Sequence, residues 1–398
     1  MTEPASYSTP FRRLATAAAF AGPFAFALTA TIIPAAVNQI SPLCNNRDTL
    51  IGWLLGVPMI GFLACVLAGG RLSDTHGKLP VLCVGCALMA VGSCMFARAY
   101  TYPVALAAAL VMGAGGGCTE AIAMAVVVEV FSAERRTSMM NCAQVFFAAG
   151  AVAGPLGVTW LLAKHIDWRW SLVVTSGFCA LASALALAAI GKREERPIGR
   201  GHVGEWRALL GDPLVIVYAL GVMLYVGAEA GQAGWLARYF ANDLGAAGPL
   251  AAFTVGLFWV GIGVGRAIAA WSAKHLTDYA IICWSLGFAT VLQTVLLLFH
   301  SAIPALITVP LLGFALASVW PTILSRAGAL HPAQTGTVLG VVVAAGGVGA
   351  GIFPPAIGQA ADAIGLRRAL WICPVLIAVN FAVFMRLWAR HRAQSEAR

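Results

Sequence analysis

Two glutamates are the residues best placed to do chemistry in this sequence, because both lie deep within long apolar segments. Of the 16 acidic residues, only Glu120 and Glu229 lie far from the polar connections and from the segment ends. A carboxylate in a hydrocarbon environment is costly while it is ionised. It therefore binds a proton near neutral pH and releases it when the local field changes. The positions predict proton binding and release, with a protonated glutamate hydrogen-bonded between helices as the alternative.

Polar and aromatic side chains accompany Glu229 at roughly helical spacing. Gln232, Trp235 and Tyr239 follow it along the same segment. Such groups suit a polyol, because amides hydrogen-bond hydroxyl groups and aromatic rings stack on the C–H faces of sugars. Ordinary packing of the tryptophan near the membrane interface is the alternative interpretation. Weaker candidates for solute binding lie on other segments: Asn141, Gln144, Trp320 and Thr322.

The segments that carry these residues are apolar enough to be membrane spans. The sequence is 60% hydrophobic and 10% charged, with a mean hydropathy of +0.85, whereas about a quarter of a soluble domain is charged. A span needs about 20 mostly apolar residues. The sequence therefore predicts an all-α membrane protein without a separate soluble domain. Twelve stretches qualify as spans: 14–38, 49–69, 79–98, 103–127, 141–163, 169–190, 214–239, 250–270, 279–299, 303–325, 335–357 and 369–388.

The net charge of +9 is distributed unevenly between the predicted connections. If the N-terminus is cytoplasmic, twelve spans place most of the 25 Lys and Arg residues on the cytoplasmic side. This asymmetry predicts cytoplasmic termini and a location in the inner membrane of the cell. It also explains the basic charge by topology, so no nucleic-acid partner is expected. Arg12 and Arg13 precede an apolar run longer than the core of a cleaved signal, so residues 14–38 are predicted to remain as the first helix.

The sequence divides into two similar halves. Residues 191–212 form the longest polar stretch between spans and separate residues 1–190 from residues 213–398. Motifs recur in the two halves at a nearly constant offset, which predicts two six-helix bundles related by a parallel repeat. The matched positions are Gly150 with Gly347, Gly154 with Gly351, Pro155 with Pro354, Arg169 with Arg367 and Arg71 with Arg266.

Motifs for metals and nucleotides are incomplete. Cys83 and Cys86 form a C-x-x-C motif without a second cysteine pair or a nearby histidine, so a packing role is expected. The glycine runs at 113–117, 261–265 and 346–351 follow no strand and precede no Gly-Lys-Ser/Thr. In apolar helices, small residues allow backbones to approach closely. We expect no metal, no cofactor and no enzymatic activity.

Three motifs together resemble the signatures of the major facilitator superfamily. The first is Gly70-Arg-Leu-Ser-Asp-Thr-His-Gly-Lys between the second and third spans. The others are Gly150-Ala-Val-Ala-Gly-Pro in the fifth span and Asp167-Trp-Arg-Trp before the sixth. The resemblance covers essentially the whole chain and implies two six-helix bundles, alternating access and a monomer in the lipid bilayer. It also implies gating by the first motif and its counterpart: Gly70, Arg71, Asp74, Gly77, Lys78 and Arg266.

Two segments also resemble the fucose/glucose/galactose proton-symporter branch. They are Gly117-Cys-Thr-Glu-Ala, which contains Glu120, and Gly227-Ala-Glu, which contains Glu229. This likeness implies import of a sugar or similar polar solute with a proton. Glu120 is then the better proton site and Glu229 the better solute contact. Unlike the fucose-type first span, residues 14–38 contain no acidic residue. Proton-coupled efflux of drugs or metabolites is the alternative function, and a receptor or scaffold without transport is a third.

Overall fold

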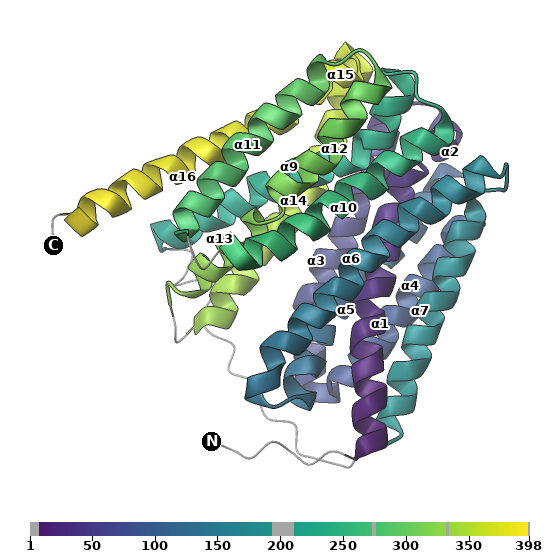
Figure 1. Ribbon diagram of the computed structural model, residues 1–398. Helices are drawn as coiled ribbons and strands as arrows, with labels where there is room; N and C mark the ends of the chain where they lie inside the picture. The colour runs from purple at the N-terminus through teal and green to yellow at the C-terminus, as the bar shows by residue number, and fades with distance from the viewer. Residues whose placement is uncertain (1–7, 193–210, 273–275, 332–333, 397–398) are drawn as a thin grey trace. The chain divides into compact units, whose positions relative to one another are not determined.

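The computed structural model describes the ranges 8–192, 211–272, 276–331 and 334–396 (Figure 1). Within these ranges, twelve helices are long and apolar enough to cross a membrane. This finding confirms the all-α class and the twelve predicted spans. Most of the predicted connection 191–212 lies outside the described residues.

The first six spans are continuous helices, with two short helical turns after the first. Between the second and third spans, Gly77 has a φ of 88°. Glycine suits this left-handed conformation because it carries no Cβ. The bounds are α1 Thr9–Ala35, α2 Val37–Ile40, the 3₁₀ helix η1 Ser41–Cys44, α3 Asp48–His76, α4 Lys78–Ala97, α5 Tyr102–Val130, α6 Ala133–Ala163 and α7 Arg169–Ile190.

The tenth span is interrupted, although the sequence predicts one stretch over 303–325. Helix α12 ends at Leu316 and α13 begins at Val319. Pro321 lacks the N–H group that would continue the helical ladder across this break. At the same place, the Ser318 hydroxyl lies 2.7 Å from the Ser285 hydroxyl of α11. The bounds are α9 Pro213–Asn242, α10 Gly248–Ser272, α11 Asp278–Leu298, α12 Ala302–Leu316, α13 Val319–Gly328, α14 Thr335–Ile364, α15 Leu366–Ala369 and α16 Ile372–Glu396.

The chain forms two compact units. The first unit contains Met1–Asn45 and Val57–His202, and the second contains Asn46–Gly56 and Val203–Arg398. The boundary falls inside α3, so the first turns of this helix pack with the second unit and the remainder with the first.

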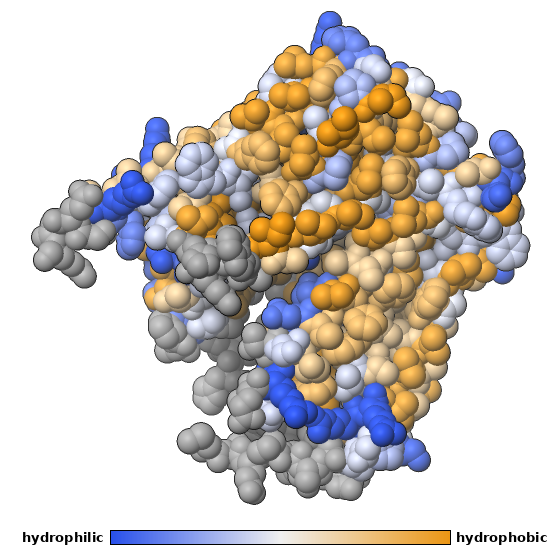
Figure 2. All heavy atoms as spheres, in the orientation of Figure 1, coloured by the Kyte–Doolittle hydropathy of each residue, from blue (hydrophilic) through white to orange (hydrophobic). Residues whose placement is uncertain are grey.

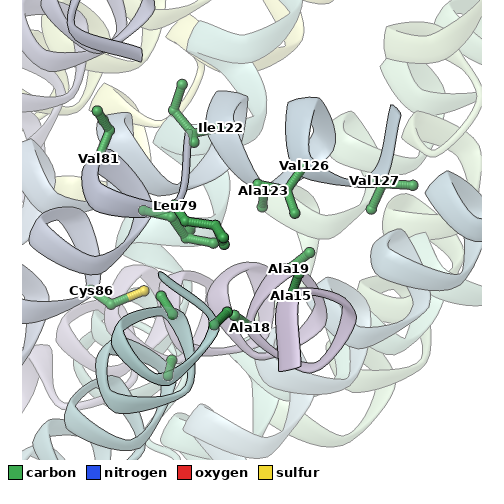
Figure 3. Packing of buried hydrophobic residues seen from close by; sticks show 14 of the residues in the cluster. Ala15, Ala18, Ala19, Leu79, Val81, Cys86, Ile122, Ala123, Val126 and Val127 are labelled. Carbon is green, nitrogen blue, oxygen red and sulfur yellow. The ribbon is translucent and has the colours of Figure 1, made fainter. Parts of the chain in front are cut away.

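Small side chains allow close packing in the first unit. Helix α1 packs against α5, α6 and α7, while α4 packs against α5 and α7. Ala15, Ala18 and Ala19 of α1 are fully buried and face the cluster formed with Leu79 and Val126 (Figure 3). Alanine on this face of α1 lets the larger side chains of the neighbouring helices fill the space between the backbones.

In the second unit, α9 is the helix that packs against most of the others. Its neighbours are α10, α13, α14 and α16, and α11 packs against α12 and α16. A Cβ atom at Gly349 of α14 would lie 2.1 Å from the carbonyl oxygen of Met223 on α9. The approach is therefore possible only because position 349 lacks a side chain.

Glycines perform the same task in both units. A Cβ atom at Gly113 of α5 would lie 1.9 Å from the carbonyl oxygen of Pro58 on α3. In the second unit, a Cβ atom at Gly261 of α10 would lie 2.0 Å from the carbonyl oxygen of Pro310 on α12. Both glycines lie inside helices. The glycine runs therefore serve helix packing, as the sequence predicts.

The outer faces of the helices are apolar. Figure 2 shows hydrophobic side chains over the helices of the visible face, with strongly hydrophilic residues gathered near helix ends. Ile303 and Ile307 of α12 are each 66% exposed. Such exposure of isoleucine is costly in water and favourable in lipid, so these faces are suited to a hydrocarbon environment.

Candidate functional site

Glu229 lies on α9 beside a phenol and a guanidinium group. Tyr225 precedes it by one helical turn, and Arg266 of α10 interacts electrostatically with both side chains. Arg266 lies within the apolar span Gly248–Ala269. An arginine stays protonated in proteins, so a permanent positive charge acts on the Glu229 carboxyl group. The second unit thus assembles an acid, a hydroxyl donor and a cation within membrane-spanning helices.

Gln232 is fully buried inside the second unit. Its Oε1 atom accepts a 2.7 Å hydrogen bond from Nε2 of Gln293 on α11. The Nε2 atom of Gln232 and the Oε1 atom of Gln293 have no hydrogen-bond partner among the described residues. The sequence analysis missed Gln293, although a lone amide in the apolar stretch 279–299 is a signal that could have found it.

Trp235 and Tyr239 are held by hydrogen bonds within the second unit. The indole Nε1 of Trp235 donates to the carbonyl oxygen of Pro354 on α14 at 3.2 Å. The hydroxyl of Tyr239 donates to the carbonyl oxygen of Leu296 on α11 at 3.2 Å. Both side chains are fully buried. Their hydrogen bonds anchor α9 to its neighbours, and solute contact by either ring stays a prediction.

Glu120 lies on α5 in the first unit, next to an aromatic cluster. The ring of Phe26 packs directly on the backbone of Gly116, one turn before Glu120. Phe26 stacks on Phe62 of α3 with centroids 5.6 Å apart and lies 6.0 Å from the ring of Phe147 on α6. Residues four apart share one face of a helix. Glu120 and the phenyl triad, which is Phe26, Phe62 and Phe147, therefore lie on the same side of α5.

The weaker candidates for solute binding lie on α6 and α13. Asn141 is exposed and Gln144 partly exposed. Trp320 and Thr322 are partly exposed on α13, where the Thr322 hydroxyl donates to the carbonyl oxygen of Ser318 at 2.6 Å. Their role in solute binding stays a prediction.

The predicted gating residues are described only in part. The side chains of Arg71 and Asp74 lie outside the described residues. Gly70 is exposed near the end of α3, and Gly77 precedes α4. Lys78 pairs with Glu129 of α5 at 3.1 Å. The sixth gating candidate, Arg266 of α10, interacts electrostatically with Glu229 of α9, and its role in gating stays a prediction.

The cysteines are consistent with a packing role. All ten are free, and the Sγ atom of Cys83 lies 3.3 Å from the Ser183 hydroxyl of α7. Cys86 is fully buried near Thr119 of α5. Within the part of the chain that the structure describes, no three His, Cys, Asp or Glu side chains gather as metal ligands.

The sequence analysis also missed a polar cluster at the start of α3. Asp362 of α14 accepts hydrogen bonds from the backbone N–H groups of Asp48 at 2.8 Å and Thr49 at 3.0 Å. Such a carboxylate stabilises the positive end of the helix dipole. The Asp48 side chain in turn pairs with Nε of Arg238 on α9 at 2.5 Å. We call Asp48, Arg238 and Asp362 the α3 clamp, because they tie the first turn of α3 to α9 and α14.

Two further acidic residues lie at the ends of α9, outside the spans. Burial raises the pKa of the Asp243 carboxyl group, and Arg367, with its Nε 4.0 Å from Oδ1, opposes the rise. At the other end, Asp212 accepts a hydrogen bond from the backbone N–H of Leu214 and lies 2.7 Å from Nε2 of His331. The hydrogen bond with His331 lowers the pKa of Asp212 below its ordinary value of 3.8.

A comparison with known families agrees with this arrangement of helices and glycine contacts. The model of the Major Facilitator Superfamily matches residues 15–325. The chain belongs to the Major Facilitator Superfamily. This family consists of transporters and not enzymes, and with its twelve apolar helices the chain is a multi-pass membrane protein.

Curated relatives within the superfamily have different substrates. The glucose/mannose transporter GlcP of Bacillus subtilis is 22% identical over 380 residues, covering 91% of this chain and 93% of the relative. Multidrug resistance protein 3 of Bacillus subtilis is 25% identical over 156 residues, covering 39% of this chain and 30% of the relative. For the first two curated fungal transporters, the match spans only 26% and 34% of their length.

Solved structures share the fold of this chain. A bacterial homolog of the human lysosomal transporter Spinster, in an inward-facing and occupied conformation, has a TM-score of 0.78 at 15% identity. The match covers 96% of this chain and 98% of that chain. The D-xylose-proton symporter has a TM-score of 0.73 at 16% identity, covering 94% and 97%. At these identities, the likeness shows the fold alone.

Proposed function

We propose that the chain is a proton-coupled importer of a sugar or similar polar solute, which it carries by alternating access. The observation that carries the proposal is the position of two carboxylates in apolar spans. Glu229 lies beside Tyr225 and Arg266 in the second unit, and Glu120 lies on α5 in the first. A charged group within a span marks a pathway for ions or solutes more often than a structural contact. Each unit thus contributes one titratable acid.

The relatives support the polar solute and the proton. The relative that matches nearly all of this chain is named as a glucose/mannose transporter, and one structural neighbour is a proton symporter of D-xylose. We also propose a location in the inner membrane, because relatives such as GlcP are bacterial. The excess of Lys and Arg residues in the connections on one side of the membrane supports cytoplasmic termini.

The test uses purified protein in liposomes with an imposed pH gradient and a panel of sugars and other polar solutes. Glu120→Gln keeps the shape and hydrogen bonding of the side chain but fixes the neutral state. The variant should lose accumulation driven by the gradient and keep counterflow, which needs no net proton movement. Asp167→Asn is the control, because the Asp167 side chain is 52% exposed and lies before α7, outside the spans. Full gradient-driven accumulation by Glu120→Gln would exclude the assignment of the proton to this residue.

Efflux of an apolar compound is the second candidate, and the phenyl triad favours it. Phe26, Phe62 and Phe147 form an aromatic surface on the side of α5 that carries Glu120. Aromatic surface suits a lipophilic solute. Vesicles of opposite orientation separate the two directions of transport. Import requires solute to move in the same direction as the protons, and efflux requires the opposite direction. The absence of solute movement in both would favour a receptor or scaffold.

A further inference from the structure

Two exposed arginines lie one helical turn apart near the end of α16. They are Arg386 and Arg390, and neither forms an ion pair with a carboxylate among the side chains that the structure describes. Arg326 of α13, by contrast, lies 3.9 Å from Asp278 of α11. Residues four apart are neighbours on one face of a helix, with about 5–6 Å between their Cβ atoms. The two guanidinium groups therefore form one basic site on the surface of α16.

Helix α11 packs beside α16 in the second unit (Figure 1). The rings of Tyr279 and His391 have centroids 5.4 Å apart. Further along, a Cβ atom at Gly287 would lie 3.3 Å from the ring of Phe381. As the residue numbers rise along α11, the numbers of their partners fall along α16. These two contacts therefore show that the helices are antiparallel and give their register.

An apolar surface runs along this helix pair and ends at the arginines. On α11, Trp284, Phe288 and Val291 are exposed and follow one another at intervals of four and three residues, so they share one face. Ala382 and Met385 are exposed on α16. With about 100° of rotation per residue, both groups lie on the same rotational side of the contact between the helices. In an antiparallel pair this is one common face, on which Trp284 lies level with Met385, directly before the first arginine.

We propose that this face of α11 and α16 binds an anionic phospholipid of the bilayer, with its phosphate at Arg386 and Arg390 and an acyl chain along Trp284 and Phe288. A phosphodiester has two anionic oxygens, and each can accept from a guanidinium group. Tryptophan is enriched at the level of lipid headgroups. Basic sites between helices on the cytoplasmic side bind acidic headgroups, and the proposed topology places the end of α16 on that side.

The net charge of the headgroup decides which lipid this site prefers. Phosphatidylcholine has the same phosphate, but its choline group carries a positive charge that cancels the phosphate and is repelled by the two arginines. Phosphatidylglycerol has no such cation. Inorganic phosphate has the charge but lacks the acyl chain that would cover Trp284. The site should therefore favour a ligand that combines a net negative charge with an acyl chain.

The first experiment measures thermal stabilisation of the purified full chain, in a neutral detergent, by dioctanoyl-phosphatidylglycerol, dioctanoyl-phosphatidylcholine and inorganic phosphate. The affinity for phosphatidylglycerol should exceed that for phosphatidylcholine by at least about tenfold, and inorganic phosphate should not stabilise the protein at the same concentration. Arg386→Gln and Arg390→Gln should each weaken binding of phosphatidylglycerol about fivefold, because each removes one charge near the headgroup. Equal affinities for the two lipids, or equal stabilisation by inorganic phosphate, would overturn the inference.

A matched control is available in the first unit. Arg13 is exposed near the start of α1, so Arg13→Gln removes the same charge far from this face in sequence and should leave binding of phosphatidylglycerol unchanged. A loss equal to that of Arg386→Gln would mean that only the total charge matters and would contradict the site. Trp284→Ala should weaken binding of both lipids and keep the preference for phosphatidylglycerol, because it shortens the apolar surface and leaves the arginines in place.

The second experiment locates the lipid in liposomes. A phosphatidylglycerol with a photoactivatable diazirine in its acyl chain is cross-linked to the full chain, and the labelled peptides are identified by mass spectrometry. Cross-links should gather on residues 284–291 and 379–386. The double variant Arg386→Gln with Arg390→Gln should lower this yield about tenfold and leave labelling of the first unit unchanged. Labelling spread evenly over the exposed spans would refute the site. Lipid binding requires no transport, so this result leaves the proposed function unaffected.

Discussion

Loss of one charge from the α3 clamp should destabilise the second unit. The change is Asp48→Asn, which keeps the shape of the side chain but removes its negative charge. Asp48 and Arg238 have side chains that are 15% and 9% exposed. Removing one partner of a buried ion pair costs about 3–5 kcal/mol, because the other charge stays buried without compensation.

The expected cost is smaller than this range for two structural reasons. Arg238 keeps a 3.5 Å contact with the carbonyl oxygen of Asn46, and it also interacts with the Asp243 carboxylate. The amide oxygen that the change introduces at this position can still accept a hydrogen bond. We therefore expect a loss of about 2 kcal/mol in the free energy of unfolding. For a unit of about 200 residues, this loss lowers Tm by about 4–8 °C.

Cysteine labelling during heating measures this change locally. Cys283 and Cys373 are buried and belong to the second unit, whereas Cys86 and Cys179 are buried in the first. A thiol-reactive dye followed by peptide mass spectrometry reports when each becomes accessible. Labelling of the second-unit cysteines should shift to lower temperature. Arg47→Gln is the control, because the Arg47 side chain is 65% exposed and 4.0 Å from Asp362, so its loss should cost less than about 1 kcal/mol.

A double-mutant cycle shows whether the pair itself is responsible. Asp48→Asn combined with Arg238→Gln removes both charges and leaves neither buried alone. The double variant should therefore lose at least about 1 kcal/mol less than the sum of the two single variants. Additive losses, or labelling of Cys283 and Cys373 at the unmodified temperature, would refute the reasoning.

Three further predictions concern packing, pH dependence and topology. Gly113→Ala should destabilise the first unit by about 3 kcal/mol in thermal unfolding, because the methyl group would meet the carbonyl oxygen of Pro58. The control is Gly177→Ala, whose methyl group lies in open space and should cost nothing, so equal effects of the two changes would contradict the packing argument. Because the pKa of Asp212 is lowered in the folded protein, its carboxylate stabilises the fold above pH 3.8, and this stabilisation disappears as the pH falls through the pKa of the folded state. Asp212→Asn should therefore lower Tm at pH 7 and change it little at pH 3, and a larger loss of Tm at pH 3 would contradict this pH dependence. A cysteine introduced by Arg200→Cys should resist impermeant reagents in intact cells and react in inverted vesicles, so labelling from outside would reverse the proposed orientation.

The spans and the acids within them could be predicted from the sequence alone. Transfer of a helix into lipid depends on the apolar character of about 20 consecutive residues, which is a local property of the chain. For the same reason, Glu120 and Glu229 stand out as acids in apolar stretches without any knowledge of their neighbours. The glycine runs indicate close helix contacts, since a residue without a side chain has few other uses in an apolar helix. The break before α13 was missed because Pro321 alone does not show whether a helix bends or stops.

The partners of these residues were decided by the tertiary structure. Hydropathy gives neither the rotation of a helix about its axis nor its neighbour, and both determine which side chains meet. The motif alone predicts a gating role for Arg266, and only the packing of α10 on α9 shows that its charge also acts on Glu229. Likewise, Arg238 reaches Asp48 across 190 residues of sequence. Only the folded chain brings these opposite charges together, because ion pairing acts over a few ångströms in space and is independent of separation along the chain.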